Sequence, residues 1–227
     1  TVNPDREFQT IHNFGASDAW SIQFVGAYWP EAKQERIADL LFSMEEREDG
    51  SPVGIGLSAW RFNIGAGSAA QGEESGINDR WRRAGSFLRP AGSFDPEAQP
   101  GQRIFLRRAR ERGVDQFYAF VNSPPVALTR NGRAHSSGGD SANLAPERYA
   151  EYARFLADVV AQVGTADGIE FAYLSPFNEP QWEWQGGQEG SPWQNHEVAA
   201  VTREVSAALV EAGLATQIEI PETAQYD

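Results

Sequence analysis

Short apolar runs recur along the chain, and a longer segment separates each run from the next. Five of these runs have the length, the aromatic or β-branched content and, in part, the alternation of β-strands. They lie within residues 8–15, 55–64, 116–121, 169–174 and 217–220. The pattern therefore predicts five strands that are distributed over the whole chain.

Four of the intervening segments carry apolar residues at steps of three and four, which is the pattern of an amphipathic helix. The first begins near Pro30, since proline suits the first turn of a helix, and Asp49-Gly50 ends it. Its predicted apolar face consists of Ile37, Leu40, Leu41 and Met44. The other helices are predicted over residues 103–112, 146–164 and 195–213, each with a glycine at or next to its end.

Strands that alternate with helices at this rhythm imply parallel strands joined by crossover helices. An α/β barrel and an open, doubly wound sheet both fit. Two G-x-G-x-x-A matches, at residues 54–59 and 65–70, would favour a dinucleotide site in the open sheet. The first precedes its strand, and the second leads into residues 71–76, which have no apolar helical face. The sequence therefore favours an α/β fold, the N-terminal portion of a (β/α)8 TIM barrel with about five β/α units, over a dehydrogenase.

A single domain is the expected organisation of the 227 residues. A complete barrel of this type typically needs ~250 residues, so we expect one barrel domain over residues 1–227 that is incomplete at its C-terminal end. Residues 1–8 are a candidate strand of an accessory β-domain. Residues 65–102 are rich in Gly, Ser, Ala and Pro without sustained periodicity. They form either an elaborated loop over a binding face or a solvated insertion.

The composition narrows the classes of partner. A formal net charge of −13 at pH 7 disfavours binding to nucleic acid or to anionic lipid and suits a neutral substrate. The chain has no cysteine and three histidines, none of which shares a ligand spacing with another, so neither a metal site nor a cofactor is predicted. No run approaches the ~18 apolar residues of a membrane span, and the first residues lack the features of a signal peptide.

Polar and aromatic residues follow the predicted strands, at the ends where the loops of α/β barrels carry functional groups. They are Asp18, Trp20, Arg61, Asn122, Asn178, Glu179, Trp182, Trp184 and Glu222. In a closed barrel these residues would converge on one mouth. Amides and carboxylates bond fixed hydroxyls and indole rings stack on the apolar face of a sugar, so the set predicts a carbohydrate site. The alternatives are a helix-capping role for Glu179 and core positions for one or two of the tryptophans.

Four motifs occur in order along nearly the whole chain. They are Phe8-Gln-Thr-Ile-His-Asn-Phe-Gly-Ala-Ser17, Arg61-Phe-Asn-Ile-Gly65, Ser123-Pro-Pro125 with Asn131-Gly132, and Ser175-Pro-Phe-Asn-Glu-Pro180. Together they resemble glycoside hydrolase family 30. Phe120-Val-Asn-Ser-Pro-Pro125, and Phe177-Asn-Glu-Pro180 followed by Gly187-Gln-Glu-Gly190, are most similar to its endo-β-1,6-galactanase branch. The glucosylceramidase and xylanase branches commonly have an aromatic residue near position 122, where this chain has asparagine.

The resemblance implies a catalytic barrel with a retaining mechanism. Glu179 would be the acid/base, Asn178 would bond the sugar 2-hydroxyl, and Arg61 would hold the nucleophile ionised and oriented. The family places its nucleophile after the seventh strand, so this residue is expected beyond residue 227. Glu222 is expected to bind the substrate or to support the residues that do, and the alternative is that it is the nucleophile of a rearranged site. Asp18, Trp20, Asn122, Trp182 and Trp184 are also expected to bind the substrate.

The implied function is endo-acting hydrolysis of a β-linked polysaccharide, preferably β-1,6-galactan, without a cofactor. The expected partners are the polysaccharide or oligosaccharide substrate and the remainder of the barrel, without which these 227 residues are expected to be inactive. The substrate class implies a secreted or periplasmic protein. A xylanase or glucosylceramidase-like hydrolase of the same family is one alternative. A non-catalytic carbohydrate-binding fragment is the other.

Overall fold

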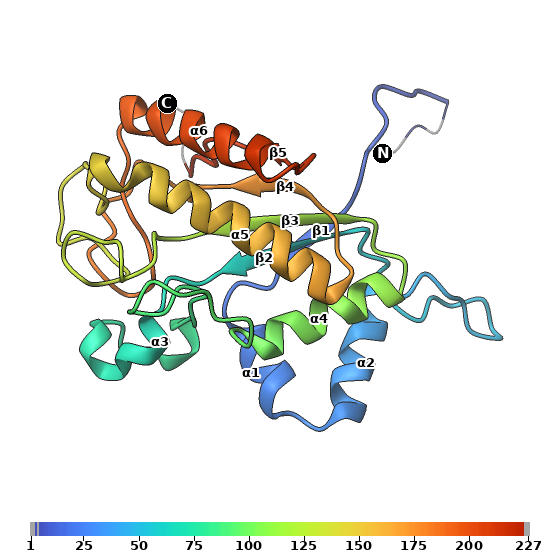
Figure 1. Cartoon of the computed structure of the whole chain (residues 1–227). Helices are drawn as coiled ribbons and strands as arrows, with labels where there is room; N and C mark the ends of the chain where they lie inside the picture. The colour runs from blue at the N-terminus through green and yellow to red at the C-terminus, as the bar shows by residue number, and fades with distance from the viewer. Residues whose placement is uncertain (1–2, 4, 225–227) are drawn as a thin grey trace.

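The computed structural model describes residue 3 and residues 5–224, which form one sheet of five parallel strands (Figure 1). The strands are β1 (Gly15–Ser17), β2 (Ala59–Ile64), β3 (Gln116–Val121), β4 (Phe171–Ser175) and β5 (Gln217–Ile218). Their order in the sheet is their order in the chain, and every neighbouring pair is parallel. The sheet therefore grows in one direction, as the strands of a barrel do.

A layer of helices accompanies the sheet (Figure 1). The longer helices of the described chain are α1 (Ser21–Tyr28), α2 (Glu31–Phe42), α4 (Pro100–Glu111), α5 (Tyr149–Asp167) and α6 (Asn195–Glu211). The short ones are α3 (Ser68–Gln71), η1 (Gly72–Ser75), η2 (Arg80–Arg82) and η3 (Pro146–Arg148). Contacts run from α1 to α4, from α4 to α5 and from α5 to α6, while α2 also packs on α4, so the longer helices form one continuous layer.

The two faces of the sheet differ in chemistry because successive strand residues point to opposite sides. The core face of β2 and β3 consists of Trp60, Phe62, Ile64, Phe117, Ala119 and Val121. Phe105 of α4 and Leu156 of α5 are fully buried in the same core. The opposite face carries Arg61, Tyr118 and Tyr173, and the two tyrosine rings stack with their centroids 4.7 Å apart. The helices therefore cover the apolar face, and polar and aromatic residues line the other.

The first strand is much shorter than the predicted segment 8–15. Only Gly15–Ser17 pairs with β2, whereas Phe8, Ile11 and Phe14 are 82%, 62% and 65% exposed. The prediction of a strand over the whole run was wrong, because these apolar side chains find no core within the described chain. The chain joins the sheet only where it comes alongside Ala59.

The helix that the sequence predicted from Pro30 onward is α2, and a further helix, α1, precedes it. α1 was not predicted, and Pro30 is the N-cap residue of α2. Gln34 is buried, and its Nε2 donates to the carbonyl oxygens of Gly26 (3.0 Å) and Trp29 (2.7 Å). A polar side chain therefore fixes the end of α1 against α2. No periodicity of apolar residues could reveal such a contact.

The predicted apolar face of this segment was partly wrong. Leu40 and Met44 are 44% and 78% exposed, and α2 ends at Phe42 instead of continuing to Asp49. The buried residues of α2 are instead Gln34, Ala38 and Phe42. Packing against α4 selects this face, since Arg108 Nη2 of α4 donates to Gln34 Oε1 over 3.0 Å.

Other boundaries differ by a few residues. α5 continues past the predicted end at Gly164 to Asp167, and Gly168 follows it in the left-handed conformation that ends many helices. β5 ends at Ile218 instead of residue 220. Residues 65–102 bury Ile77 and Phe87 completely, so this stretch is a packed loop and not a solvated insertion.

The N-terminal residues were predicted to supply a strand of an accessory β-domain. Residues 3 and 5–8 form no strand, while residues 1, 2 and 4 lie outside the described residues. The accessory domain itself stays a prediction. Among the residues that the structure describes, no helix combines the length and the apolar character that crossing a membrane requires.

Candidate active site at the strand ends

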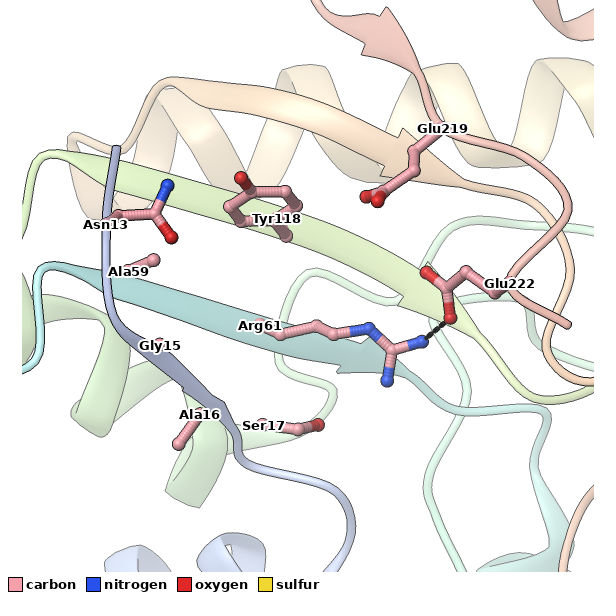
Figure 2. Close-up of a pocket in the computed structure, with 9 residues that line it drawn as sticks. All are labelled: Asn13, Gly15, Ala16, Ser17, Ala59, Arg61, Tyr118, Glu219 and Glu222. Carbon is pink, nitrogen blue, oxygen red and sulfur yellow. Dashed lines mark hydrogen bonds and ion pairs between the residues drawn. The ribbon is translucent and has the colours of Figure 1, made fainter. Parts of the chain in front are cut away.

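An ion pair joins β2 to the segment that follows β5. Arg61 Nη2 pairs with Glu222 Oε2 (Figure 2). The same nitrogen donates to Asn178 Oδ1 over 3.3 Å. The guanidinium carbon lies 3.3 Å from the ring centroid of Phe120, which places the cation over an aromatic face. Three segments that are distant in the sequence therefore meet at Arg61.

This ion pair lies in a cavity of about 380 Å³ on the uncovered face of the sheet. The cavity is lined by Asn13, Gly15, Ala16, Ser17, Ala59, Arg61, Tyr118, Glu219 and Glu222 (Figure 2). Burial raises the pKa of Glu222, and the Arg61 charge opposes that rise. Burial also lowers the pKa of Arg61, which Glu222 opposes in turn. Each group therefore stabilises the charged form of the other in a partly desolvated site.

Glu179 lies beside this pair and its backbone is held by hydrogen bonds. Its N–H donates to the Glu222 carbonyl oxygen over 3.0 Å. Its carbonyl oxygen accepts from the N–H of Trp182 (3.1 Å) and from Nε1 of Trp184 (3.0 Å). The residue has φ +45, an uncommon conformation for a residue with a side chain. Its side chain is only partly buried, so the carboxyl is not enclosed by packing.

The helix-capping alternative for Glu179 was wrong. The helix after β4 is α6, whose N-cap residue is Gln194 and whose capping box includes Glu197. Another acid therefore performs the capping, and Glu179 stays at the strand end.

Asp18 and Asn122 lie beneath this surface instead of on it. They are only 2% and 4% exposed, and Asn63, which is fully buried, lies between them. Asp18 Oδ1 accepts from the Asn63 N–H over 2.9 Å, and Asn122 Nδ2 donates to Asn63 Oδ1 over 2.9 Å. Burial raises the pKa of Asp18 well above its usual value. The enclosed side chains hold the ends of β1, β2 and β3 together, so the structure does not support the prediction that Asp18 and Asn122 touch a sugar.

The tryptophans divide into exposed and packed positions. Trp182 is 46% exposed, whereas Trp193 is buried among aromatic core residues. Trp184 is partly buried and bonded to Glu179. Trp20 is partly buried at the start of α1, with the Arg82 guanidinium 5.7 Å from its ring centroid. Trp182 therefore presents an open stacking surface, and Trp193 is an ordinary core residue.

Residues 1–227 match the sequence profile of O-Glycosyl hydrolase family 30. This chain belongs to glycoside hydrolase family 30. The match confirms the resemblance that the four sequence motifs indicated. The family acts on glycosidic bonds, so its shared substrate class is carbohydrate.

Three relatives match at least 99% of the chain. An endo-beta-1,6-galactanase of Hypocrea rufa is 26% identical, over 100% of this chain and 50% of the galactanase. The crystal structure of a conserved exported protein from Bacteroides fragilis is 40% identical, with a TM-score of 0.92 over 99% of this chain and 46% of that one. The catalytic domain of GH30 xylanase C from Talaromyces cellulolyticus is 22% identical, with a TM-score of 0.72 over 99% and 49%.

The chain thus spans about half the length of the relatives that it matches. The structural likeness confirms the predicted fold class, five parallel strands alternating with helices, as about half of the family's TIM barrel. Among the described residues, the structure contains no group of three or more side chains that could hold a metal ion.

Sequence reasoning assigned no role to two side chains that line the cavity and to a third that is buried in the loop after β4. Tyr118 and Glu219 line the cavity. Because successive side chains of a strand point to opposite faces, the pattern of β3 could have indicated that Tyr118 lies on the other face from Phe117. Glu189 is the third. It is fully buried, and it accepts from Ala66 N (2.9 Å) and from Ser68 N (3.1 Å) and Oγ (2.5 Å). The Gly187-Gln-Glu-Gly190 motif included this residue but gave no sign of its partners.

Proposed function

We propose that this family 30 chain is part of a retaining, endo-acting glycoside hydrolase that cleaves β-1,6-galactan, with Glu179 as its acid/base. The observation that carries the proposal is the position of Glu179, whose backbone is bonded to Glu222 beside the cavity that Arg61 lines. The match to the Hypocrea rufa endo-beta-1,6-galactanase over the whole chain supports the choice of substrate.

The chemistry assigns a task to each neighbour of Glu179. An acid/base carboxyl protonates the leaving oxygen and later accepts a proton from water. The Asn178 Oδ1 atom accepts from Arg61, so Nδ2 is the atom that we propose for the bond to the sugar 2-hydroxyl. Trp182, with its open ring, stacks on an adjacent sugar.

Retention also requires a nucleophile about 5–5.5 Å from the acid/base. Glu222 pairs with Arg61, which favours its ionised form, but it follows β5, whereas the family resemblance places the nucleophile after the seventh strand. We assign Glu222 to substrate binding and place the nucleophile on a barrel strand outside these 227 residues. The chain alone would then bind glycan without cleaving it.

Product analysis tests the proposal. The chain together with the rest of its barrel is incubated with β-1,6-galactan, glucuronoxylan and β-1,6-glucan. We expect oligosaccharides from the galactan alone, with the β-configuration retained in the first product seen by NMR. Cleavage of the xylan or of the β-1,6-glucan would favour another branch of the family, and binding without cleavage would favour a carbohydrate-binding role.

We also propose that the protein acts outside the cytoplasm. Polysaccharides of this class are too large to enter cells intact, and the Bacteroides fragilis relative is described as exported. Recovery of the protein from the culture medium or the periplasm tests this location.

A further inference from the structure

The carboxyl of Glu189 joins two loops that border the active site. One is the turn after β2, whose Ala66 and Ser68 donate to both of its oxygens. The other is the loop after β4, which carries both Glu189 and the proposed acid/base. Because Glu189 is 0% exposed, these bonds are shielded from water.

The next residue continues this connection towards Glu179. Gly190 packs against the indole of Trp184 so closely that a Cβ atom on residue 190 would lie 2.3 Å from Trp184 Cδ2. Trp184 Nε1 in turn donates to the carbonyl oxygen of Glu179 over 3.0 Å. A contiguous path of contacts thus runs from Ser68 through Glu189, Gly190 and Trp184 to Glu179.

A third loop meets the same point. The Gly190 N–H donates to the carbonyl oxygen of Ala134 over 2.8 Å, and His135 forms an isolated parallel bridge with Gly190. Residues 189 and 190 therefore connect the loops that follow β2, β3 and β4. Glu179 and Trp184 have φ +45 and +51, conformations that persist only when the surroundings hold them.

We propose that Glu189 is a positioning residue for proton transfer by Glu179, an inference that rests on the proposed function. Its buried bonds fix the loop after β4 against the turn after β2 and so hold Trp184 under the Glu179 backbone. Without them the loop relaxes, and a shift of about 1 Å at an acid/base can cost on the order of 100-fold in rate. The loss of rate should be confined to cleavage of the glycosidic bond with protonation of the leaving oxygen by Glu179.

The test compares two galactosides that differ in their leaving group. A β-1,6-galacto-oligosaccharide needs a proton on its leaving oxygen, whereas a dinitrophenyl β-galactoside departs without one. For Glu189→Gln in the chain together with the rest of its barrel, we expect kcat/KM to fall about 10- to 100-fold on the oligosaccharide and less than about 3-fold on the aryl galactoside. The matched control is Glu183→Gln, an exposed glutamate of the same loop, which should change neither value.

A second variant keeps the test decisive if Glu189→Gln does not fold. Ser68→Ala removes one donor to Glu189 and leaves the carboxyl in place, so it should show the same preference for the aryl galactoside with a smaller loss. Equal losses on both substrates, or no loss in either variant, would overturn the inference. If the unsubstituted protein cleaves no glycan, the proposed function is contradicted together with this inference. If it cleaves another glycan, the variants are compared on that glycan and on the matching aryl glycoside.

Discussion

The backbone N–H of Glu179 donates a hydrogen bond to the carbonyl oxygen of Glu222, 3.0 Å away. Both residues have positive φ values, +45 and +51, and both follow strands of the sheet. The bond fixes the end of β4 to the segment after β5 and brings two carboxyl-bearing residues to one place. The proposed chemistry depends on this junction.

Replacing the acid/base should separate cleavage from binding. For Glu179→Gln in the chain together with the rest of its barrel, we expect turnover of unactivated galactan to fall by about 10²- to 10⁴-fold, because the amide cannot donate the required proton. Galactan affinity, measured by calorimetry, should change little. The control is Glu183→Gln, which should keep full activity, and unaltered turnover of Glu179→Gln would refute the role.

The Arg61–Glu222 pair should be coupled in stability. Arg61→Met leaves a partly buried carboxyl without its cation, and we expect a loss of about 1–3 kcal/mol in the free energy of unfolding, between the values for exposed and buried pairs. The double variant Arg61→Met/Glu222→Gln should lose less than the sum of the two single variants. Urea denaturation measures all four proteins, and additive losses would show that the two side chains are not coupled.

Glu189 should make stability fall with rising pH. Burial raises its pKa from 4.5 to about 7, so the folded chain holds a proton that the unfolded chain has already released. The contribution of this bound proton to the free energy of unfolding is fully present below about pH 4.5 and is lost as the pH rises through about 7. The total loss is on the order of 3 kcal/mol. Urea denaturation at pH 5 and pH 8 measures it. Glu189→Gln should reduce this dependence and Glu183→Gln should not. Asp18 and Glu222, whose pKa values burial also raises, should account for the remaining slope, so an unchanged slope in Glu189→Gln would assign the whole effect to other groups.

Two tryptophans after β4 should respond in opposite ways to truncation. Trp182→Ala removes an exposed ring and should weaken glycan binding by about 10-fold with little change in stability, since stacking on an aromatic face contributes on the order of 1 kcal/mol. Trp193→Ala removes a ring that is 5% exposed and should cost about 3–5 kcal/mol of folding free energy. Calorimetric titration and thermal unfolding measure the two effects, and unchanged binding by Trp182→Ala would exclude it from the sugar site.

Sequence patterns were most reliable where one face of an element packs on a continuous core. The strand predicted over residues 116–121 coincides with β3. The helices near residues 103–112 and 195–213 also correspond to α4 and α6 within a few residues. In these segments the apolar positions of the sequence predict the buried positions of the structure, because the repeat of two or of 3.6 residues matches the geometry of the element.

The patterns failed where burial depends on a distant partner. The run at residues 8–15 looks like a strand, yet most of it has no neighbour to bury its side chains. Gln34 is polar and nevertheless buried, because its amide bonds the end of α1 and a helix from elsewhere in the chain. Local composition carries no information on either relationship.

By itself, the sequence determined the alternation of strands and helices, the family and the residues that stand at the strand ends, because each of these is encoded in short, contiguous stretches. Only the tertiary structure decided that Asp18 and Asn122 are enclosed, that Arg61 pairs with Glu222 and that Glu189 connects two loops. These outcomes depend on parallel crossovers that bring segments more than forty residues apart within hydrogen-bonding distance. The physical reason is that hydrogen bonds and ion pairs act over a few ångströms in space, whatever the separation along the chain.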